Sequence, residues 1–386
     1  MREKIAIYIE SYLPMKDKGI VEYTIDFSSI NDAEIFFSHS FAEVEYSPYK
    51  FYKLVTPYLG QKRMHVGSWY KLPFSFFEGA SYMQYSEFDE GSAVFSGAIS
   101  VCDNEDDFKK FLMDPPKSDE SVTHSIKLSF SRKVKKLVVV NCGQANWNEI
   151  YTPKETLLYD IGASSYFNQH QIKALVDKRF SLYNSKIDII ISHWDKDHFQ
   201  AIKYLNSAQM KKINAVYGPS NRPQTNVYTD AINNLENNGV KCLFIAPTNK
   251  RRGRSIDLNM LSSTNEMDVY RAVKGSSRNQ SGIVLCIKGS QNIALLTGDH
   301  HYTKILNAIN GKYVSKKLIL VAPHHGGEAG KLSVQDWQKE FSLISCAISV
   351  GHNSYNHPQQ NLAKLNTLHN GCCERTDLGG DVSYTL

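Results

Sequence analysis

The chain of 386 residues has few cysteines, no long hydrophobic run and no repeated or low-complexity segment. Its seven cysteines include no CxxC pair, and only Cys372 and Cys373 are close together in sequence. This pattern excludes a disulfide framework and a cysteine-based zinc site, and favours reduced thiols. No stretch approaches the ~18–20 apolar residues of a membrane-spanning helix, and the first residues lack the apolar core of a secretory signal. We therefore expect a cytoplasmic protein with no membrane partner.

Charge and aromatic residues are unevenly distributed along the chain. Residues 1–130 carry 13 Lys and Arg against 20 Asp and Glu, a net charge of −7, and hold 24 of the 44 aromatic residues. The remaining residues carry 31 basic and 19 acidic side chains, a net charge of +12. Two compositions in one chain predict two structural units, and the basic unit is the better candidate for an anionic partner.

Residues 1–115 are predicted to form an accessory domain or N-terminal extension that contains β-structure. Short runs rich in Val, Ile, Tyr and Phe favour strands, but no chemical motif accompanies them. The abundant aromatic residues have three possible uses: a β-rich core, which is the commonest, stacking on single-stranded nucleic acid, or docking of a protein partner. Pro115 and Pro116 open a polar linker over 116–132, and a second domain follows over 133–386.

From residue 133 on, short apolar runs alternate with longer polar segments of helical character. Runs such as GIVLCIKG (282–289), NIALLTGD (292–299) and KLILVAPHH (317–325) are typical of strands buried on both faces. Several of these runs end in Gly, Asp or His, which places polar side chains at the carboxyl ends of the strands. Open α/β sheets build their sites at those ends. The pattern predicts an α/β fold with layers packed on both faces of its strands.

The strongest chemical motif is SHWDKDH (192–198), directly after an apolar strand. His193, Asp195, Asp197 and His198 stand at positions i, i+2, i+4 and i+5, and imidazole and carboxylate are the ligands of divalent metal ions. A solvated charged turn is the alternative, but one tryptophan and two histidines make such a turn a poor fit. The loop is therefore predicted to bind metal.

Two more strand ends support this prediction. LLTGD ends at Asp299, and PHHGG contains His324 and His325. Taken alone, the first is an ordinary strand-to-turn exit and the second is ambiguous. Three apolar strands that each end in possible metal ligands favour one shared metal site.

With these motifs, the sequence resembles the metallo-β-lactamase fold, and in particular the soluble hydrolase domain of the ComEC/Rec2 competence proteins and their stand-alone relatives. The likeness covers about residues 133–386. The matching motifs, in the order of the family, are LVVVNCGQANWNEI (137–150), LLYDIG (157–162), SHWDKDH (192–198), NQSGIVLCIKGSQNIALLTGD (279–299), LILVAPHHGG (318–327), SVGHNSYNHP (349–358) and ERTDLGG (374–380).

The resemblance implies an αββα sandwich with one or two divalent ions at one edge of its two sheets. The implied ligands are His193, Asp195, Asp197, His198, Asp299 and one of His324 and His325. Asp197 is the candidate base for the attacking water and His325 the candidate acid, although Asp195 and His324 are open alternatives. Asp160 is expected to orient a ligand from behind. His357, which precedes Pro358, either reaches the substrate or braces a turn, and the turn is the commoner role.

The sequence departs from the family pattern at three places. Asn146 stands where the family has an acid, and Phe199, Gln200 and Ala201 replace the glycines that follow the metal loop. No histidine lies between residues 198 and 300, so the third histidine of typical zinc β-lactamases is missing. A site richer in oxygen donors favours Mn²⁺ or Mg²⁺ over Zn²⁺, and the missing ligand also fits one tight and one weak ion.

The substrate is predicted to be a phosphodiester. The longest basic run contains Lys250, Arg251, Arg252 and Arg254, which are suited to bind nucleic-acid phosphates unless they form only a solvated loop. The ComEC-type resemblance also implies DNA degradation, so a metal-dependent nuclease is the first hypothesis. Hydrolysis of a small phosphoester, cyclic nucleotide or amide is the second. A catalytically idle scaffold subunit of a multi-protein system, of which a defence system is one example, is the third.

Overall fold

The computed structural model describes residues 4–15, 19–39, 51–57, 64–73, 81–84, 93–96, 111–114, 122–123, 125–126, 128, 130–248, 256–275, 277–290, 292–313, 316–341, 343–353 and 356–386. The chain divides into two units. One comprises Met1–Asp119 together with Pro223–Asn234, and the other comprises Glu120–Arg222 together with Leu235–Leu386. None of the described helices is long and apolar enough to cross a membrane.

The N-terminal unit contains a seven-stranded sheet and the helix α1 (Ile30–His39). Its strands, in spatial order, are β5 (Ser81–Gln84), β6 (Ala93–Ser96), β3 (Tyr52–Pro57), β2 (Ile20–Phe27), β1 (Lys4–Met15), β4 (Trp69–Pro73) and β7 (Leu112–Met113). Alternate residues of β1, Ile5, Ile7 and Ile9, are fully buried with Tyr23 and Phe36 in one core. At least part of the aromatic content therefore fills a β-rich core.

The beginning of helix α5 (Asn226–Asn237) also belongs to this unit. Tyr228 donates its hydroxyl to the buried Glu10 carboxylate at 3.0 Å, and the Val227 amide donates to Asp26 at 3.2 Å. Burying two carboxylates is costly unless they accept hydrogen bonds, so these contacts stabilise the unit. The residues concerned begin α5 (Asn226–Asn237), and nothing in the sequence had indicated this role.

The second unit contains two sheets whose strands are mixed in direction. The first sheet runs through β22 (Val382–Thr385), β9 (Lys136–Val139), β10 (Trp147–Tyr151), β11 (Thr156–Ile161), β12 (Ile187–Ile190), β13 (Ile213–Pro219), β14 (Lys241–Ile245) and β8 (Val122–Thr123). The second runs through β15 (Leu258–Ser263), β16 (Met267–Ala272), β17 (Ile283–Lys288), β18 (Asn292–Leu296), β19 (Lys317–Val321), β20 (Ile344–Ile348) and β21 (Glu374–Arg375). Strands β11 to β14 and β18 to β21 pair in parallel.

Side-chain alternation along the strands explains why the two sheets pack face to face. On β18, Ala294 and Leu296 join Leu157 and Ile190 of the first sheet in one buried cluster. The intervening Leu295 points to the opposite face, because neighbouring residues of a strand face opposite sides. The core between the sheets thus receives every second residue of the apolar runs.

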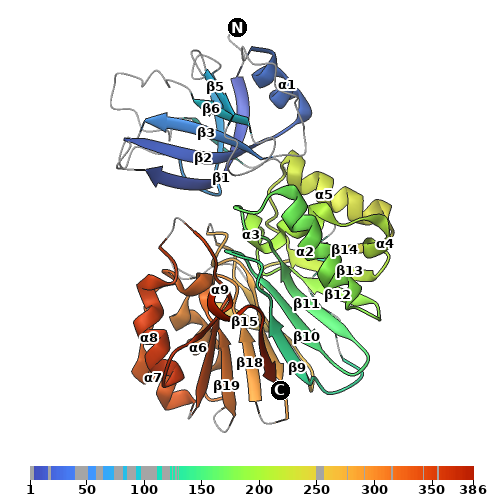
Figure 1. The fold of residues 1–386 in the computed structure, drawn as a ribbon, viewed down its shortest axis with the longest axis vertical. Coiled ribbons are helices and arrows are strands. Elements are labelled where there is room, and N and C mark those ends of the chain that lie inside the picture. Colours follow the sequence, from blue (N-terminus) through green and yellow to red (C-terminus); the bar gives the residue numbers. More distant parts are fainter. Residues whose placement is uncertain are drawn as a thin grey trace. The chain divides into compact units, whose positions relative to one another are not determined.

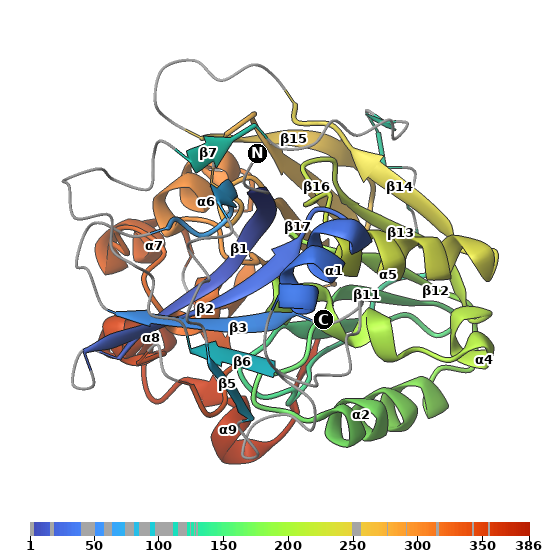
Figure 2. The ribbon, with the colours of Figure 1, turned by 90° about the horizontal axis from the view of Figure 1, so that it is seen from above.

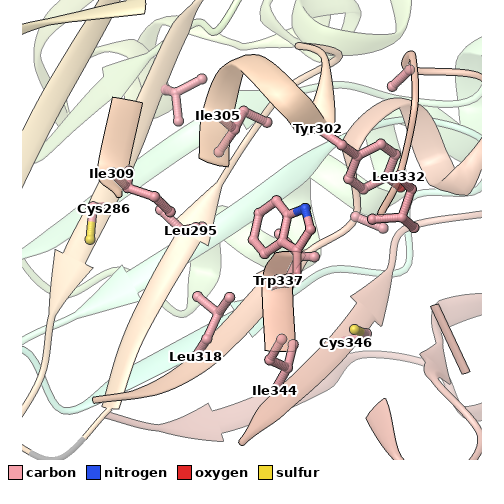
Figure 3. Close-up of a cluster of buried hydrophobic side chains, with 14 of the residues drawn as sticks. Cys286, Leu295, Tyr302, Ile305, Ile309, Leu318, Leu332, Trp337, Ile344 and Cys346 are labelled. Carbon is pink, nitrogen blue, oxygen red and sulfur yellow. The ribbon is translucent and has the colours of Figure 1, made fainter. Parts of the chain in front are cut away.

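Helices cover both outer faces of this sandwich. Leu295, Leu318 and Cys346 pack with Ile305 of α6 (Tyr302–Ile309) and Trp337 of α7 (Val334–Glu340), as Figure 3 shows. In Figures 1 and 2, α6, α7 and α8 (Gln359–His369) line the second sheet, whereas α2 (Gln169–Ser181) and α4 (Ser207–Met210) lie on the side of the first. The unit is therefore a four-layer αββα sandwich.

Candidate metal centre

Three strand ends meet at one edge of the sandwich. His193 follows β12 of the first sheet, whereas Asp299 and His325 follow the neighbouring strands β18 and β19 of the second. The two sheets are joined beside these residues, because the Ile283 amide donates to the Ser192 carbonyl at 2.9 Å. The carboxyl ends that the sequence marked as polar therefore converge.

The metal loop is held in place by its tryptophan. Trp194 is 2 % exposed and donates its indole N–H to the Pro219 carbonyl at 2.6 Å. Its ring packs against Phe199 and Phe244, with centroids about 6 Å apart. The short helix α3 (Lys196–Phe199) starts directly after Asp195. A buried anchor followed by a helix fixes the directions of the loop's polar side chains, so the solvated-turn alternative does not describe it.

His198 forms a close contact with Asp160. Its Nδ1 lies 2.8 Å from Asp160 Oδ2, and the same carboxylate accepts the Ser192 amide at 2.6 Å. Asp160 has a φ of 60°, a left-handed conformation that directs it beneath the loop. Asn146 donates its amide to Asp160 at 3.0 Å, which explains why an amide stands there in place of an acid. The proton of His198 on Nδ1 faces a carboxylate, and Nε2 faces the centre.

Asp299 lies at the middle of the cluster and is 5 % exposed. Its Oδ1 is 3.3 Å from His198 Nε2, and its Oδ2 is 3.6 Å from the Nε2 atoms of both His193 and His324. Asn279 donates its side-chain amide to Oδ2 at 3.1 Å. One carboxylate thus faces three imidazoles, so its two oxygens are placed to act as ligands at more than one metal position.

His324 and His325 face the centre from an unusual backbone. Both residues are left-handed, with φ of 51° and 55° in η5 (Pro323–Gly326). His325 Nδ1 donates to the Ser349 carbonyl at 2.7 Å, and its Nε2 lies 3.2 Å from Asp197 Oδ2. His324 Nδ1 donates to the Glu328 carbonyl at 2.9 Å. Two successive non-glycine residues in this region cost of order 1–3 kcal/mol each, and such strain is concentrated at functional sites.

The donor set fits a divalent cation. Among the described residues, His193 Nε2, His198 Nε2 and Asp299 Oδ1 are buried atoms with no hydrogen-bond partner. Such atoms are costly unless something satisfies them. Two groups bring their ligand atoms within 4.8 Å of one another: His193, His198 and Asp299, and Asp197, His198 and His325. Mixed imidazole and carboxylate donors suit Zn²⁺ and Mn²⁺, and the carboxylates also suit Mg²⁺.

Charges within the cluster shift its pKa values. Burial alone would raise the pKa of Asp197, but the charge of His198 and the hydrogen bond from His325 outweigh it and lower that pKa. Burial likewise opposes the low pKa of Asp299, which His324, His198 and His193 hold well below its ordinary range. Conversely, Asp160 and Asp299 overcome burial and raise the pKa of His198 well above 6.5. Without a metal ion, the carboxylates and the His198 imidazole therefore stabilise one another's charged forms.

These directions predict that metal binding releases protons. His198 and His325 have raised pKa values, yet a metal ion requires the unprotonated nitrogen of each. A higher pH therefore favours binding, and affinity for Mn²⁺ should fall as pH falls, by at most about tenfold per released proton for each unit of pH. Calorimetric titrations in two buffers of different ionisation enthalpy count the released protons. The Asp336→Asn protein, changed at an exposed acid of α7, is the control and should release as many protons as wild type, whereas a wild-type affinity independent of pH would contradict the prediction.

The structure places the remaining predicted residues in different settings. His357 lies beside His324, with ring centroids 4.8 Å apart, and its Nδ1 is 3.1 Å from Gln144 Nε2. Burial and the neighbouring imidazoles lower its pKa to about 3, so it is neutral at pH 7. Asp195 is paired with an arginine, Arg278, with Nε and Oδ1 2.8 Å apart. The predicted phosphate-binding residues Lys250, Arg251, Arg252 and Arg254 lie outside the described residues.

Sequence reasoning missed three contributors to this centre. Arg278 and Asn279 come from the loop before β17, and Ser349 contributes only a carbonyl. The motif that begins at Asn279 was recognised, but its first residue was not counted as part of the site. Ser349 likewise begins a recognised motif, but a backbone acceptor leaves no signature in side-chain identity, so its role was not predicted.

A third group of possible ligands, Cys346, His369 and Cys373, lies away from this centre. His369 Nδ1 accepts the Cys346 amide at 2.9 Å, which leaves the proton of a neutral ring on Nε2. Neither nitrogen then presents a free lone pair to a metal.

Comparisons with known proteins concern the fold. No protein-family model and no curated protein matches the sequence. The structure is similar to the metallo-β-lactamase fold protein YhfI from Bacillus subtilis at 12% identity and a TM-score of 0.38, covering 66% of this chain and 100% of that one. Human tRNase Z, short form, gives 15% identity and a TM-score of 0.37, covering 64% of this chain and 98% of that one. A diphosphatase of the PhnP family gives 12% identity and a TM-score of 0.37, covering 65% of this chain and 98% of that one.

The predicted fold class is confirmed. The two facing sheets with helices on both outer faces form the expected αββα sandwich, in which the metal-loop motif follows a strand of the first sheet and the other two exits follow strands of the second. The sheet within residues 4–113 provides the expected β-containing extension. The chain therefore has an α/β fold with an αββα sandwich and a β-rich N-terminal unit.

Proposed function

We propose that this chain is a metal-dependent hydrolase that cleaves phosphodiester bonds in nucleic acid. The observation that carries the proposal is the convergence of buried imidazole nitrogens and carboxylate oxygens, several of them without a hydrogen-bond partner among the described residues, at one edge of the sandwich. The ordered ComEC-type motifs and the net positive charge of residues 131–386 support a phosphodiester over an uncharged substrate.

The residues divide between holding the ion and orienting those that hold it. Those that could hold one or two ions are His193, His198, Asp197, Asp299 and His325. Asp160 and the Ser349 carbonyl fix the ring orientations of His198 and His325 from behind. When bound, a divalent ion would polarise a phosphoryl oxygen and lower the pKa of a water molecule.

Two residues are suited to move protons. Asp197 has a lowered pKa and a side chain that is 32 % exposed, so it is ionised at pH 7 and accessible to an incoming nucleophile. His325, the predicted acid, is buried and fixed at both nitrogens, which suits a ligand better. His324 is 29 % exposed at its side chain and stands on the open side of the pair, so we assign it the protonation of the leaving group.

The test is cleavage of labelled linear DNA, circular DNA and RNA with Mn²⁺, Mg²⁺ or Zn²⁺. Cleavage should require the metal, stop with chelator and return when metal is added back. The Asp299→Asn protein, purified identically, is the control against contaminating nuclease. A small phosphodiester and a cyclic nucleotide tested in parallel distinguish a small-molecule hydrolase from a nuclease. A folded, metal-loaded protein without activity on any of these substrates would contradict the proposal and favour a scaffold role.

A further inference from the structure

The metal loop contains one carboxylate that an arginine holds. Arg278 Nε lies 2.8 Å from Asp195 Oδ1, with side chains only 8 % and 17 % exposed. The Arg278 guanidinium also donates to the Trp194 carbonyl at 3.3 Å, so it contacts the loop at two points. A largely buried ion pair together with a hydrogen bond to the backbone holds the guanidinium more firmly than an exposed pair would.

Asp195 has different neighbours from the other acids of the centre. Among the described residues, neither group whose ligand atoms lie within 4.8 Å of one another includes Asp195. The nearest imidazole, His193, has its Nε2 3.6 Å from Asp195 Oδ2 and equally far from Asp299. The sequence also lacks the third histidine of typical zinc β-lactamases, because no histidine lies between residues 198 and 300. The imidazoles on the Asp195 side are those of His193 and His324, which both face Asp299 Oδ2, and Arg278 adds a resident positive charge.

The loop that carries Arg278 is itself anchored. Arg271 of β16 is 1 % exposed and donates to the carbonyl oxygens of Ser281 and Gly282 within that loop. The Ser281 amide donates to the Arg278 carbonyl at 3.0 Å. The next residue, Asn279, donates to Asp299. Two successive residues of an anchored turn thus contact two carboxylates of the centre, which positions the guanidinium reproducibly.

We propose that Arg278 takes the place of one of the two divalent ions, so that the chain holds a single ion among Asp197, His198, Asp299 and His325. This inference rests on the proposed function, whose metal count it specifies. A guanidinium is always protonated, and its charge repels a divalent cation from the neighbouring position on Asp195. On the side of the centre away from Arg278, the carboxylates of Asp197 and Asp299 balance the charge of one divalent ion. The imidazoles of His198 and His325 there are already oriented by Asp160 and by the Ser349 carbonyl.

The experiment counts ions. The full chain is stripped of metal, titrated with Mn²⁺ by calorimetry, and its bound manganese is measured after desalting. The wild-type protein should bind one equivalent. Arg278→Gln should bind close to two, because the freed Asp195 and His193 then become available, whereas Arg278→Lys keeps the charge and should bind one. Arg375→Gln removes an arginine paired with Asp377 away from the centre and should leave the count at one.

Asp195→Asn gives a second measurement that does not depend on the Arg278 variants folding. Because Asp195 is not a ligand in this arrangement, the variant should still bind one ion, whereas Asp197→Asn should weaken binding about 100-fold. Two equivalents in the wild-type protein, or one equivalent in folded Arg278→Gln, would overturn the inference and leave the hydrolase proposal intact. No bound ion in the wild-type protein would overturn both.

Discussion

Replacing Asp299 by asparagine is expected to lower the rate of hydrolysis by on the order of 10³-fold and the affinity for Mn²⁺ by about 100-fold. The geometry explains why this residue has the largest effect. Its two oxygens face the Nε2 atoms of His193, His198 and His324 at 3.3–3.6 Å, so one carboxylate serves the whole cluster. Asparagine keeps the volume but removes the negative charge and one acceptor.

The same substitution should change the metal-free protein. Asp299 helps to raise the pKa of the buried His198, and its loss leaves that imidazolium with less compensation. The metal-free variant should therefore be less stable than wild type below the raised pKa of His198, and the difference should shrink as pH rises and the ring loses its proton. Asp336→Asn, at an exposed acid of α7, is the matched control and should leave activity, affinity and stability unchanged. Wild-type metal affinity in Asp299→Asn would contradict the assignment.

Much of the fold could be predicted because its strands are apolar along their whole length. The runs at 282–289, 292–299 and 317–325 correspond to β17, β18 and β19, each placed between the facing sheet and the helices. Strand β16 lacks such a run. Its buried Asp268 pairs with Lys288 at 2.6 Å, and its buried Arg271 donates to backbone carbonyls. Buried polar residues with long-range partners interrupt hydrophobic patterning, so local sequence does not reveal the strand.

The candidate site was predictable to the extent that its ligands follow strands directly. The positions of His193, Asp197 and His198 follow from one loop on one rigid strand. The pairing of Asp195 with Arg278 joins residues 83 positions apart, so no spacing rule contains it. The same limit applies to His325, whose ring is oriented by the Ser349 carbonyl. Sequence identifies donors well, whereas the partners that orient them depend on tertiary structure.

A single methyl group at position 162 is expected to destabilise the metal loop. Gly162 follows β11, and its amide donates to the Asn146 carbonyl at 2.8 Å, while the Asn146 amide donates to the Asp197 carbonyl at 2.9 Å. A Cβ atom at Gly162 would lie 1.8 Å from the Asp197 carbonyl oxygen and 2.9 Å from that of Asn146. Both obstacles are backbone atoms, so no side-chain rotation relieves the clash.

Gly162→Ala must therefore move the backbone of Asp197 by about 1 Å or more, and misplacement on that scale costs about 100-fold in rate. The strain should also lower the free energy of unfolding by about 2–3 kcal/mol, as measured by urea denaturation of the metal-free protein. Gly379→Ala is the control, because a Cβ there meets nothing within 4 Å, and its stability should change by less than about 0.5 kcal/mol. If Gly162→Ala kept both the wild-type unfolding midpoint and the wild-type affinity for Mn²⁺, the hydrogen-bonded path from β11 to Asp197 would not be what fixes the loop. If Gly162→Ala lowered both the unfolding midpoint and the affinity for Mn²⁺, and Gly379→Ala lowered neither, a position without any side chain would set the geometry of the centre.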